Sequence, residues 1–178
     1  MRRRPVVYLC ALVALTAFQC IAQERRETAP PPEPQVILFV CEHGSAKSVI
    51  AAAHFNRMAS EKGLPYRAVT CGVNPDQELP PTVLRGLAAD GLDVASWKPQ
   101  KVGDADVVTA NRVITIACSL PATRSTSAVK VTEWNDIPNV SDGYEAARKA
   151  IVDRVTELLN SLSKNSFLEE RSCDRDPQ

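Results

Sequence analysis

The sequence predicts an α/β domain of three layers, in which a four-stranded parallel β-sheet is covered by helices on both faces. Apolar runs of strand length alternate with segments of helical periodicity between residues 36 and 162. The first run, VILFV at residues 36–40, is apolar without alternation, which is typical of a strand buried on both faces. With 178 residues, 44% of them hydrophobic, and 21 basic against 21 acidic residues, the chain suits one globular domain.

The elements follow in the order strand, helix, strand, helix, strand, strand, helix. The expected strands are residues 36–40, 66–70, 113–118 and 130–133, and the first two expected helices are residues 48–61 and 81–90. Gly63 and Gly91 follow these helices closely and are typical of helix ends. The third strand is rich in β-branched residues, which favour strands. This alternation predicts the parallel sheet.

A third, amphipathic helix is expected near the C-terminus. Its apolar residues recur at steps of three and four and are Tyr144, Ala147, Ile151, Val155, Leu158 and Leu162. Ser141 is the expected N-terminal cap. Residues 163–178 show little periodicity, and we expect them to form a flexible tail.

Residues 1–22 are expected to be a secretory signal peptide. Three arginines precede an apolar run at residues 6–18, and small residues precede a cleavage site ahead of Gln23. The run is too short to cross a hydrocarbon layer of ~30 Å, so an uncleaved anchor is the weaker alternative. A lipid anchor on Cys20 is weaker still, because Phe18 and Gln19 stand where such sites carry small residues. The sequence therefore predicts a secreted or periplasmic protein with no stable membrane insertion after cleavage.

A proline-rich linker is expected at residues 23–35, ahead of the folded domain at residues 36–162. The stretch ETAPPPEPQ within it holds four prolines, which disfavour both helix and sheet. Loss of the three arginines in the signal peptide leaves 18 basic against 21 acidic residues, a net charge of about −3. This balance argues against a nucleic-acid partner. The sequence leaves the oligomeric state open.

Cys41 is the leading candidate for a functional residue. It stands where the first strand ends, and ligands of parallel sheets bind beyond this edge. The amides of the following loop and the start of the next helix form an environment that binds anions and lowers the pKa of a thiol. Gly44 lets the loop bend back, Ser45 and Ala46 leave room for an oxyanion, and Lys47 adds a positive charge. The pattern predicts a thiolate nucleophile.

The stretch VILFVCEHGSAKS resembles the signature of the low-molecular-weight protein tyrosine phosphatases and of the arsenate reductases that share their fold. That signature is an apolar strand followed by Cys, five residues, Arg and Ser. The stretches GLAADGLDVASWKPQKV at residues 86–102, RVITIACS and TEWNDIP resemble later parts of the same family. The resemblance covers about residues 36–162. It implies a strand order of 2-1-3-4, a small phosphorylated or oxyanion substrate and no cofactor.

The resemblance also implies roles for individual residues. Cys41 would attack phosphorus and form a cysteinyl-phosphate, and Ser48 would hydrogen-bond its thiolate. Asp136 would protonate the leaving oxygen and later activate water. The oxyanion would be held by the loop residues Glu42, His43, Gly44, Ser45, Ala46, Lys47 and Ser48. The implied activity is hydrolysis of a phosphomonoester such as phosphotyrosine.

Three positions depart from the family pattern. Lys47 replaces an arginine, which would fork two hydrogen bonds onto the oxyanion, whereas lysine supplies charge without that geometry. Glu42 places a carboxylate beside the thiol, where it opposes an incoming anion. Ile137 separates Asp136 from Pro138, although the family's acid directly precedes proline. These departures leave open whether the loop turns over a substrate.

Each candidate has a structural alternative. Cys41 can be a small buried hydrophobe, Lys47 a solvated residue, and Asp136 a turn residue. Ser48 can be a helix cap. The two histidines, His43 and His54, are expected to face solvent and to be structural, respectively. With no Cys-x-x-Cys pair and no His-x-x-x-His spacing, the sequence predicts no metal site.

The cysteines support a second enzymatic interpretation. In the implied strand order, Cys41 lies between Cys71 and Cys118 at about one strand spacing, ~5 Å. By resemblance to the arsenate reductases, Cys118 stands where a resolving thiol would be, and Cys71 is a further candidate. An oxidising compartment disfavours such a reductase, so the phosphatase is ranked first. A third alternative is an oxyanion-binding domain without catalysis.

Overall fold

The computed structural model describes residues 33–120 and 129–173, with side chains described as far as Lys164. The described residues belong to one compact unit. The predicted signal peptide and residues 23–32 of the predicted linker lie outside the described residues. The elements are β1 (Gln35–Cys41), α2 (Lys47–Glu61), β2 (Tyr66–Gly72), α3 (Pro81–Ala89), α4 (Asp104–Thr109), β3 (Arg112–Ile116), β4 (Lys130–Trp134), the 3₁₀ turn η2 (Val140–Asp142) and α5 (Tyr144–Cys173).

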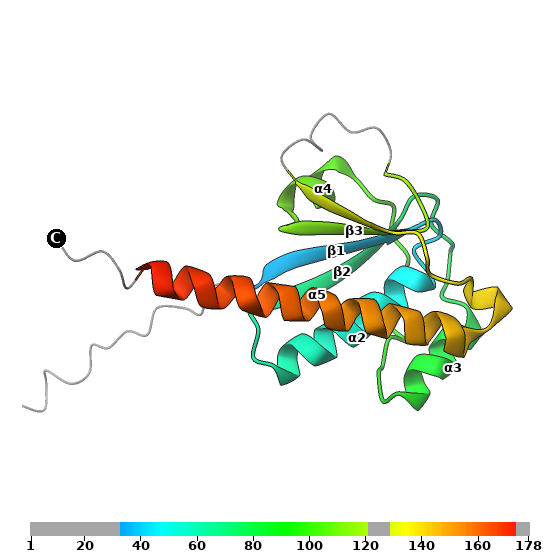
Figure 1. The fold of residues 1–178 in the computed structure, drawn as a ribbon. Helices are drawn as coiled ribbons and strands as arrows, with labels where there is room; N and C mark the ends of the chain where they lie inside the picture. The colour runs from blue at the N-terminus through cyan, green and yellow to red at the C-terminus, as the bar shows by residue number, and fades with distance from the viewer. Residues whose placement is uncertain (1–32, 121–128, 174–178) are drawn as a thin grey trace, which may run out of the picture. The chain divides into compact units, whose positions relative to one another are not determined.

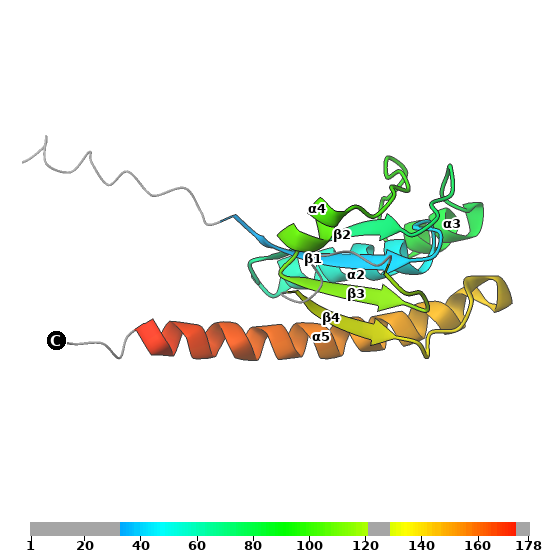
Figure 2. The same ribbon diagram turned by 90° about the horizontal axis from the view of Figure 1, so that it is seen from above.

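The four strands form a parallel sheet in the order β2-β1-β3-β4, which confirms the predicted fold class (Figure 2). The first strand along the chain is thus central. In its register, Cys41 pairs with Gly72 of β2 on one side and with Ile116 of β3 on the other. The three chain segments that leave the sheet after these residues therefore start at the same edge.

Helices cover both faces of the sheet (Figure 1). On one face, Ile37, Phe39 and Cys41 of β1 belong to a buried cluster that includes residues of α2, α3 and α5. On the other face, Leu38 and Val40 belong to a second cluster with Val107 of α4 and neighbouring residues. Because both faces of β1 are buried, its sequence shows no polar alternation.

The last helix, α5, buries the predicted apolar stripe against α2 but differs at both ends from the prediction. It starts at Tyr144, and the N–H of Ala147, in its first turn, donates to Gly143 O at 3.3 Å. Ser141 does not cap it, since Ser141 lies in η2 and its hydroxyl donates to Asp142 Oδ1. The helix continues through residues 163–173, a stretch without proline or glycine to end it.

Two further differences concern the segments before and after β3. The helix α4 was absent from the sequence prediction, because six residues are too few to show periodicity. Its start is fixed by Asp106, whose carboxylate accepts a hydrogen bond from the N–H of Gly103. β3 ends two residues earlier than expected, since Ala117 has a φ of 50° and turns the chain out of the sheet.

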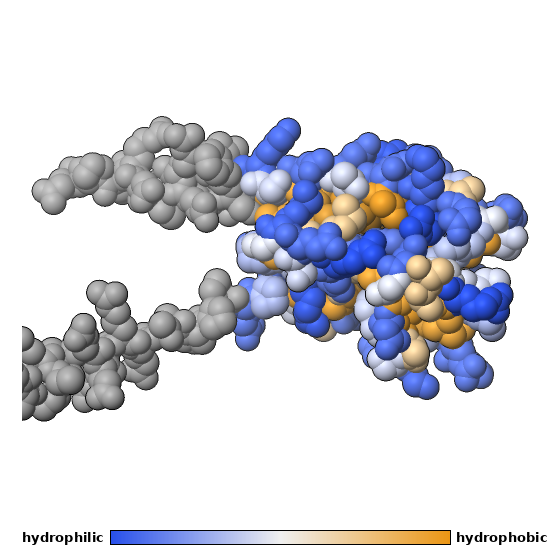
Figure 3. Space-filling model, turned by 90° about the horizontal axis from the view of Figure 1, so that it is seen from below, coloured by the Kyte–Doolittle hydropathy of each residue, from blue (hydrophilic) through white to orange (hydrophobic). Residues whose placement is uncertain are grey.

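The face of the domain on the side of α2 and α5 is mainly hydrophilic, with hydrophobic residues in smaller patches between polar ones (Figure 3). The stretches 33–120 and 129–173 contain no helix long and apolar enough to span a membrane.

Candidate active site

A cleft of about 510 Å³ opens at the carboxyl ends of β1 and β3. It is lined by residues of the loop after β1 and the start of α2, of the segment between β2 and α3 and the start of α3, of the end of β3, and of the segment between β4 and α5. These residues are Cys41, Glu42, His43, Ser45, Ala46, Lys47, Asp76, Pro80, Thr82, Ile116, Ala117, Asn139, Val140 and Ser141. Six of the residues predicted for the site therefore line one cavity.

Cys41 lies at the base of this cleft and is only 5% exposed. Its Sγ is 3.2 Å from Ser48 Oγ, in the first turn of α2. Thr70 of β2 donates its hydroxyl proton to the same Ser48 oxygen at 2.7 Å. Because Ser48 accepts from Thr70, its own proton is free to be donated to the sulfur. The chain of two hydroxyls thus leads from β2 to the sulfur of Cys41.

The loop after β1 is held by the chain segment that follows β2. Three backbone N–H groups donate to consecutive carbonyls of the loop: Val73 to Cys41 at 3.1 Å, Asn74 to Glu42 at 2.8 Å, and Asp76 to His43 at 3.0 Å. The amides of loop residues 42–46 have no hydrogen-bond acceptor within the described residues. The carbonyls are thus engaged on the side of residues 73–76, and the amides remain free to bind an anion.

Two glycines, one in the loop after β1 and one at the end of β2, allow these two segments to lie close together. Gly44 has a φ of 60°, a conformation that favours glycine. A Cβ on Gly44 would lie 2.7 Å from Gly72 N, and a Cβ on Gly72 would lie 2.6 Å from Gly44 N. The two backbones can only meet because neither residue has a side chain.

Lys47 begins α2 and connects the loop with the segment between β4 and α5. Its Nζ donates to Ile137 O at 3.2 Å and to the side-chain oxygen of Asn139 at 3.1 Å. An ammonium group has three donors, so one stays available for an anion in the cleft. Lys47 thus lines the cleft as predicted, and two of its donors bind the segment between β4 and α5.

The structure does not bring Asp136 into the cleft. Its side chain is 59% exposed and forms an ion pair with Arg154 of α5, with Oδ2 2.6 Å from the guanidinium. Hydrogen bonding to Arg154 lowers the pKa of Asp136, so the carboxyl stays ionised. The next residue, Ile137, is buried in the core, and the preceding carboxylate turns to solvent. From this segment, Asn139 lines the cleft instead.

A carboxylate that the sequence analysis missed, Asp76, lines the cleft. Its Oδ2 accepts a hydrogen bond of 2.5 Å from Ser45, and its Oδ1 lies 3.5 Å from His43 Nδ1. Its only sequence signal was its place shortly after the second strand. Glu42, the carboxylate that the sequence singled out, is exposed and accepts from Asn74 Nδ2 at 2.6 Å.

Two further cysteines with described side chains, Cys71 and Cys118, lie near the carboxyl ends of β2 and β3. Cys118 lies after β3, and its thiol donates to Val40 O at 3.5 Å, one residue from Cys41. Cys71 belongs to the cluster on the opposite face of the sheet from Cys41, and Cys118 packs against that same cluster, so neither thiol belongs to the cluster that holds Cys41. Burial raises the pKa of both Cys71 and Cys118 to about 11. All three thiols are free.

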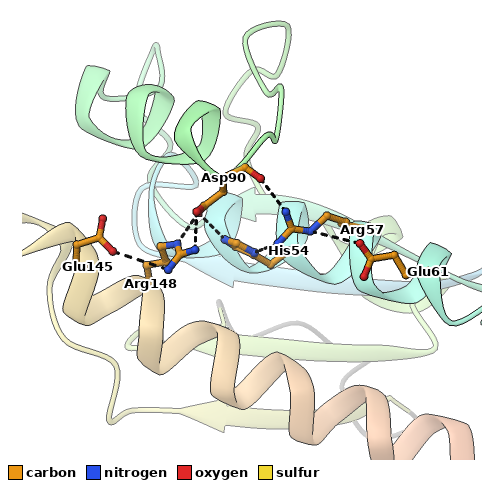
Figure 4. Close-up of polar contacts among 6 residues, drawn as sticks. All are labelled: His54, Arg57, Glu61, Asp90, Glu145 and Arg148. Atoms are coloured by element: carbon orange, nitrogen blue, oxygen red, sulfur yellow. Dashed lines mark hydrogen bonds and ion pairs between the residues drawn. The ribbon is translucent and has the colours of Figure 1, made fainter.

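The second histidine, His54, is part of a polar cluster away from the cleft (Figure 4). It is 1% exposed, its Nε2 lies 3.3 Å from Asp90 Oδ2, and its Nδ1 contacts Arg57. Asp90 also binds the guanidinium of Arg148 through both oxygens. Burial, opposed by Asp90, lowers the pKa of His54. The cluster joins α2, the end of α3 and α5. Across residues 33–120 and 129–164, no group of three His, Cys, Asp or Glu side chains could hold a metal ion.

Comparison with known proteins finds a matching family model and several similar solved structures. Residues 36–168 match the family model described as low molecular weight phosphotyrosine protein phosphatase. No curated protein sequence matches the chain. Among solved structures, an arsenate reductase from Archaeoglobus fulgidus is 31% identical, with 70% of this chain and 98% of that chain covered and a TM-score of 0.57.

Two more distant structures share the fold. A low molecular weight protein tyrosine phosphatase from T. tengcongensis is 18% identical, with 71% of this chain and 99% of that chain covered and a TM-score of 0.65. A thioredoxin-dependent arsenate reductase from Corynebacterium glutamicum is 23% identical, with 86% and 73% of the two chains covered and a TM-score of 0.65.

Proposed function

Because the chain belongs to the low-molecular-weight phosphotyrosine protein phosphatase family, we propose that it hydrolyses a phosphomonoester through a cysteinyl-phosphate on Cys41. The observation that carries this proposal is the hydroxyl chain from Thr70 through Ser48 to Cys41 Sγ, at the base of an open cleft. A hydroxyl group that donates a hydrogen bond to sulfur favours the thiolate form, both when the sulfur attacks and when it leaves.

In the first step, the Cys41 thiolate attacks phosphorus, the phosphorus–oxygen bond to the leaving group breaks, and its electron pair goes to the leaving oxygen. In the second step, water attacks phosphorus, and the sulfur–phosphorus electron pair returns to Cys41. Ser48 donates a hydrogen bond to the departing sulfur. The free amides of residues 42–46 and Lys47 stabilise the negative charge on the phosphoryl oxygens.

Replacement of Cys41 by Ser tests this proposal. We expect the wild-type protein to hydrolyse p-nitrophenyl phosphate and to give a phosphocysteine after acid quench, and the Cys41→Ser variant to lose both while still binding phosphate in calorimetry. Ser48→Ala should slow the second step, so that the phosphoenzyme accumulates. Hydrolysis unchanged by Cys41→Ser would contradict the proposal. Phosphate binding without any turnover in the wild type would favour an oxyanion-binding domain.

Arsenate reduction is a second candidate, favoured by the contact of Cys118 with Val40 O beside Cys41. Here the Cys41 thiolate would displace hydroxide from arsenate, and Cys118 would attack Cys41 Sγ. The two electrons of the sulfur–arsenic bond would pass to arsenic, which leaves as arsenite, and a supplied dithiol would reduce the resulting disulfide. Arsenate-dependent oxidation of dithiothreitol, abolished by Cys118→Ala and unaffected by Cys71→Ala, would support this activity over phosphate-ester hydrolysis.

We also propose that the protein is exported. The support for this comes from residues 1–22 alone, which have the charge, apolar run and small residues of a secretory signal. Hydrolysis of a phosphate ester consumes no electrons, so it needs no reductant in an oxidising compartment. Export and phosphatase chemistry are therefore compatible.

A further inference from the structure

The proposed hydrolysis requires a group that protonates the leaving oxygen, and the group expected for this role is not in the cleft. Asp136 faces solvent beside Arg154, outside the cleft. Asn139, which reaches the cleft from the same segment, carries a carboxamide, which does not titrate near neutral pH and cannot act as a general acid. The acid must therefore come from another lining residue.

Apart from Cys41 and Lys47, the titratable side chains that line the cleft are Glu42, His43 and Asp76. The carboxylate of Glu42 accepts a hydrogen bond from Asn74 on the exposed side of the loop. Asp76 accepts from Ser45 with one oxygen and faces His43 with the other. Both carboxylates act as acceptors, which leaves the imidazole as the proton donor.

His43 has the features of an acid–base residue. Its side chain is 62% exposed and lines the cleft two residues after Cys41. Nδ1 lies 3.5 Å from Asp76 Oδ1, and no hydrogen bond or ion pair in the described part of the chain engages Nε2. A carboxylate at Nδ1 fixes the tautomer and the orientation of an imidazole, so that the other nitrogen is free to meet a substrate.

The position of Asp76 is in turn fixed from two sides. Its backbone N–H donates to the carbonyl of His43 at 3.0 Å, and its carboxylate binds the buried hydroxyl of Ser45. The pair is thus built into the contact between the loop after β1 and the segment after β2. Besides this pair, the titratable side chains that line the same cleft are Glu42, Lys47 and Cys41.

We propose that His43, oriented by Asp76, is the acid and base of this active site, an inference that rests on the proposed phosphatase activity. When Cys41 attacks phosphorus, the imidazolium gives its Nε2 proton to the leaving oxygen, and the products are an alcohol, the cysteinyl-phosphate and a neutral imidazole. In the second step, Nε2 takes a proton from the attacking water, which restores the imidazolium and releases phosphate. Asp76 is a positioning residue in this scheme.

The test compares two substrates that differ in their need for an acid. The oxygen of p-nitrophenyl phosphate leaves readily as an anion, whereas that of phenyl phosphate leaves poorly without a proton. We expect His43→Gln to lower kcat for phenyl phosphate by about 10²-fold and to change kcat for p-nitrophenyl phosphate far less. Asp76→Asn should give the same substrate dependence with a smaller loss. Added imidazole should partly restore phenyl phosphate hydrolysis by His43→Ala.

The controls separate this role from folding and from the neighbouring carboxylates. Inhibition by inorganic phosphate should be similar in the wild type and in His43→Gln, which shows an intact cleft. Asp153→Asn, at an exposed carboxylate of α5, should behave as the wild type. Asp136→Asn tests the competing acid, and the stronger loss with phenyl phosphate in this variant would overturn our inference.

Equal losses with both substrates in His43→Gln, or no loss with either, would overturn the inference while leaving the phosphatase proposal standing. A wild-type protein that hydrolyses neither substrate would overturn both. The two failures are therefore distinguishable.

Discussion

Lys47 is the residue at which the site differs most in chemistry from the signature that it resembles. Its ammonium donates to Ile137 O and to Asn139 Oδ1 and has one donor left for an anion. A guanidinium at this position could keep contacts with the neighbouring segment and still present two parallel N–H groups to a phosphoryl group.

We therefore predict that Lys47→Arg raises kcat for p-nitrophenyl phosphate by about tenfold or more, because a fork of two donors stabilises the transition state better than one. Steady-state kinetics of the variant and of Lys149→Arg, a conservative change on the exposed face of α5, measure this. An unchanged or lower kcat in Lys47→Arg would mean that the oxyanion does not lie against residue 47.

At the scale of single residues, the sequence predicted those that follow one strand and missed those that arrive from elsewhere. Cys41 and Ser48 lie seven positions apart around one loop, so the signature itself brings them together. Asp76 and Asn139 come from two other segments that meet the loop only in the folded chain. Asp136 was predicted wrongly to reach the cleft, since the burial of Ile137 decides the direction of its neighbour.

Among the elements, α2, α3 and α5 are joined by the cluster around His54 and Asp90 (Figure 4). Burial lowers the pKa of His54 below its ordinary value of 6.5, so the unfolded chain binds a proton at a higher pH than the folded chain does. The contribution of His54 to the free energy of unfolding is therefore fully present above about pH 6.5 and is lost as the pH falls toward the lowered pKa. The pKa of Asp90 is also lowered, and its contribution is lost only at pH values below 3.8.

We predict that the free energy of unfolding falls between about pH 7.5 and pH 5.5, and that His54→Gln reduces this fall. Urea denaturation at a series of pH values measures both slopes. The comparison uses slopes because the substitution of a buried side chain also lowers stability at every pH. A slope that His54→Gln leaves unchanged would assign the pH dependence to other groups.

A second contact between elements joins α3 to the first residue of α5. A Cβ on Gly86 would lie 2.1 Å from Cζ of the Tyr144 ring, so the ring packs directly on the glycine backbone. Tyr144 is half-buried there, and burial raises its pKa to about 12. Such a contact leaves no room for even a methyl group.

We predict that Gly86→Ala destabilises the domain by about 1–3 kcal/mol, because the ring must move out of its place. The double variant Gly86→Ala with Tyr144→Leu should recover part of this loss in a double-mutant cycle, measured by thermal or urea unfolding. Additive effects of the two substitutions would show that the ring does not meet the new methyl group.

The sequence was most informative for elements with long apolar patterns. The four strands and their parallel order were predicted, since β1 and β3 are buried on both sides and the family resemblance gave the order. The short helix α4 and the true start of α5 were not. At the two helix starts, Gly103 N donates to the Asp106 carboxylate and Ala147 N donates to Gly143 O, contacts that composition does not reveal.

For the molecule as a whole, export stays a prediction that rests on residues 1–22. Expression of the full chain in a bacterial host should place the protein outside the cytoplasm, with Gln23 as the first residue found by N-terminal sequencing. Leu12→Arg, which interrupts the apolar run, should keep the chain in the cytoplasm and uncleaved. Wild-type protein that retains Met1 in the cytoplasmic fraction would contradict the prediction.

The contact between Gly44 and Gly72 has a consequence for how this chain can change over evolutionary time. Each residue is excluded from gaining a side chain by the backbone of the other, although 28 positions separate them in sequence. A single substitution at either one would push the nucleophile's loop away from the neighbouring strand. Among related sequences, the two glycines should therefore be kept or lost together, and retention of both would mark the lineages in which this loop is still under selection for chemistry.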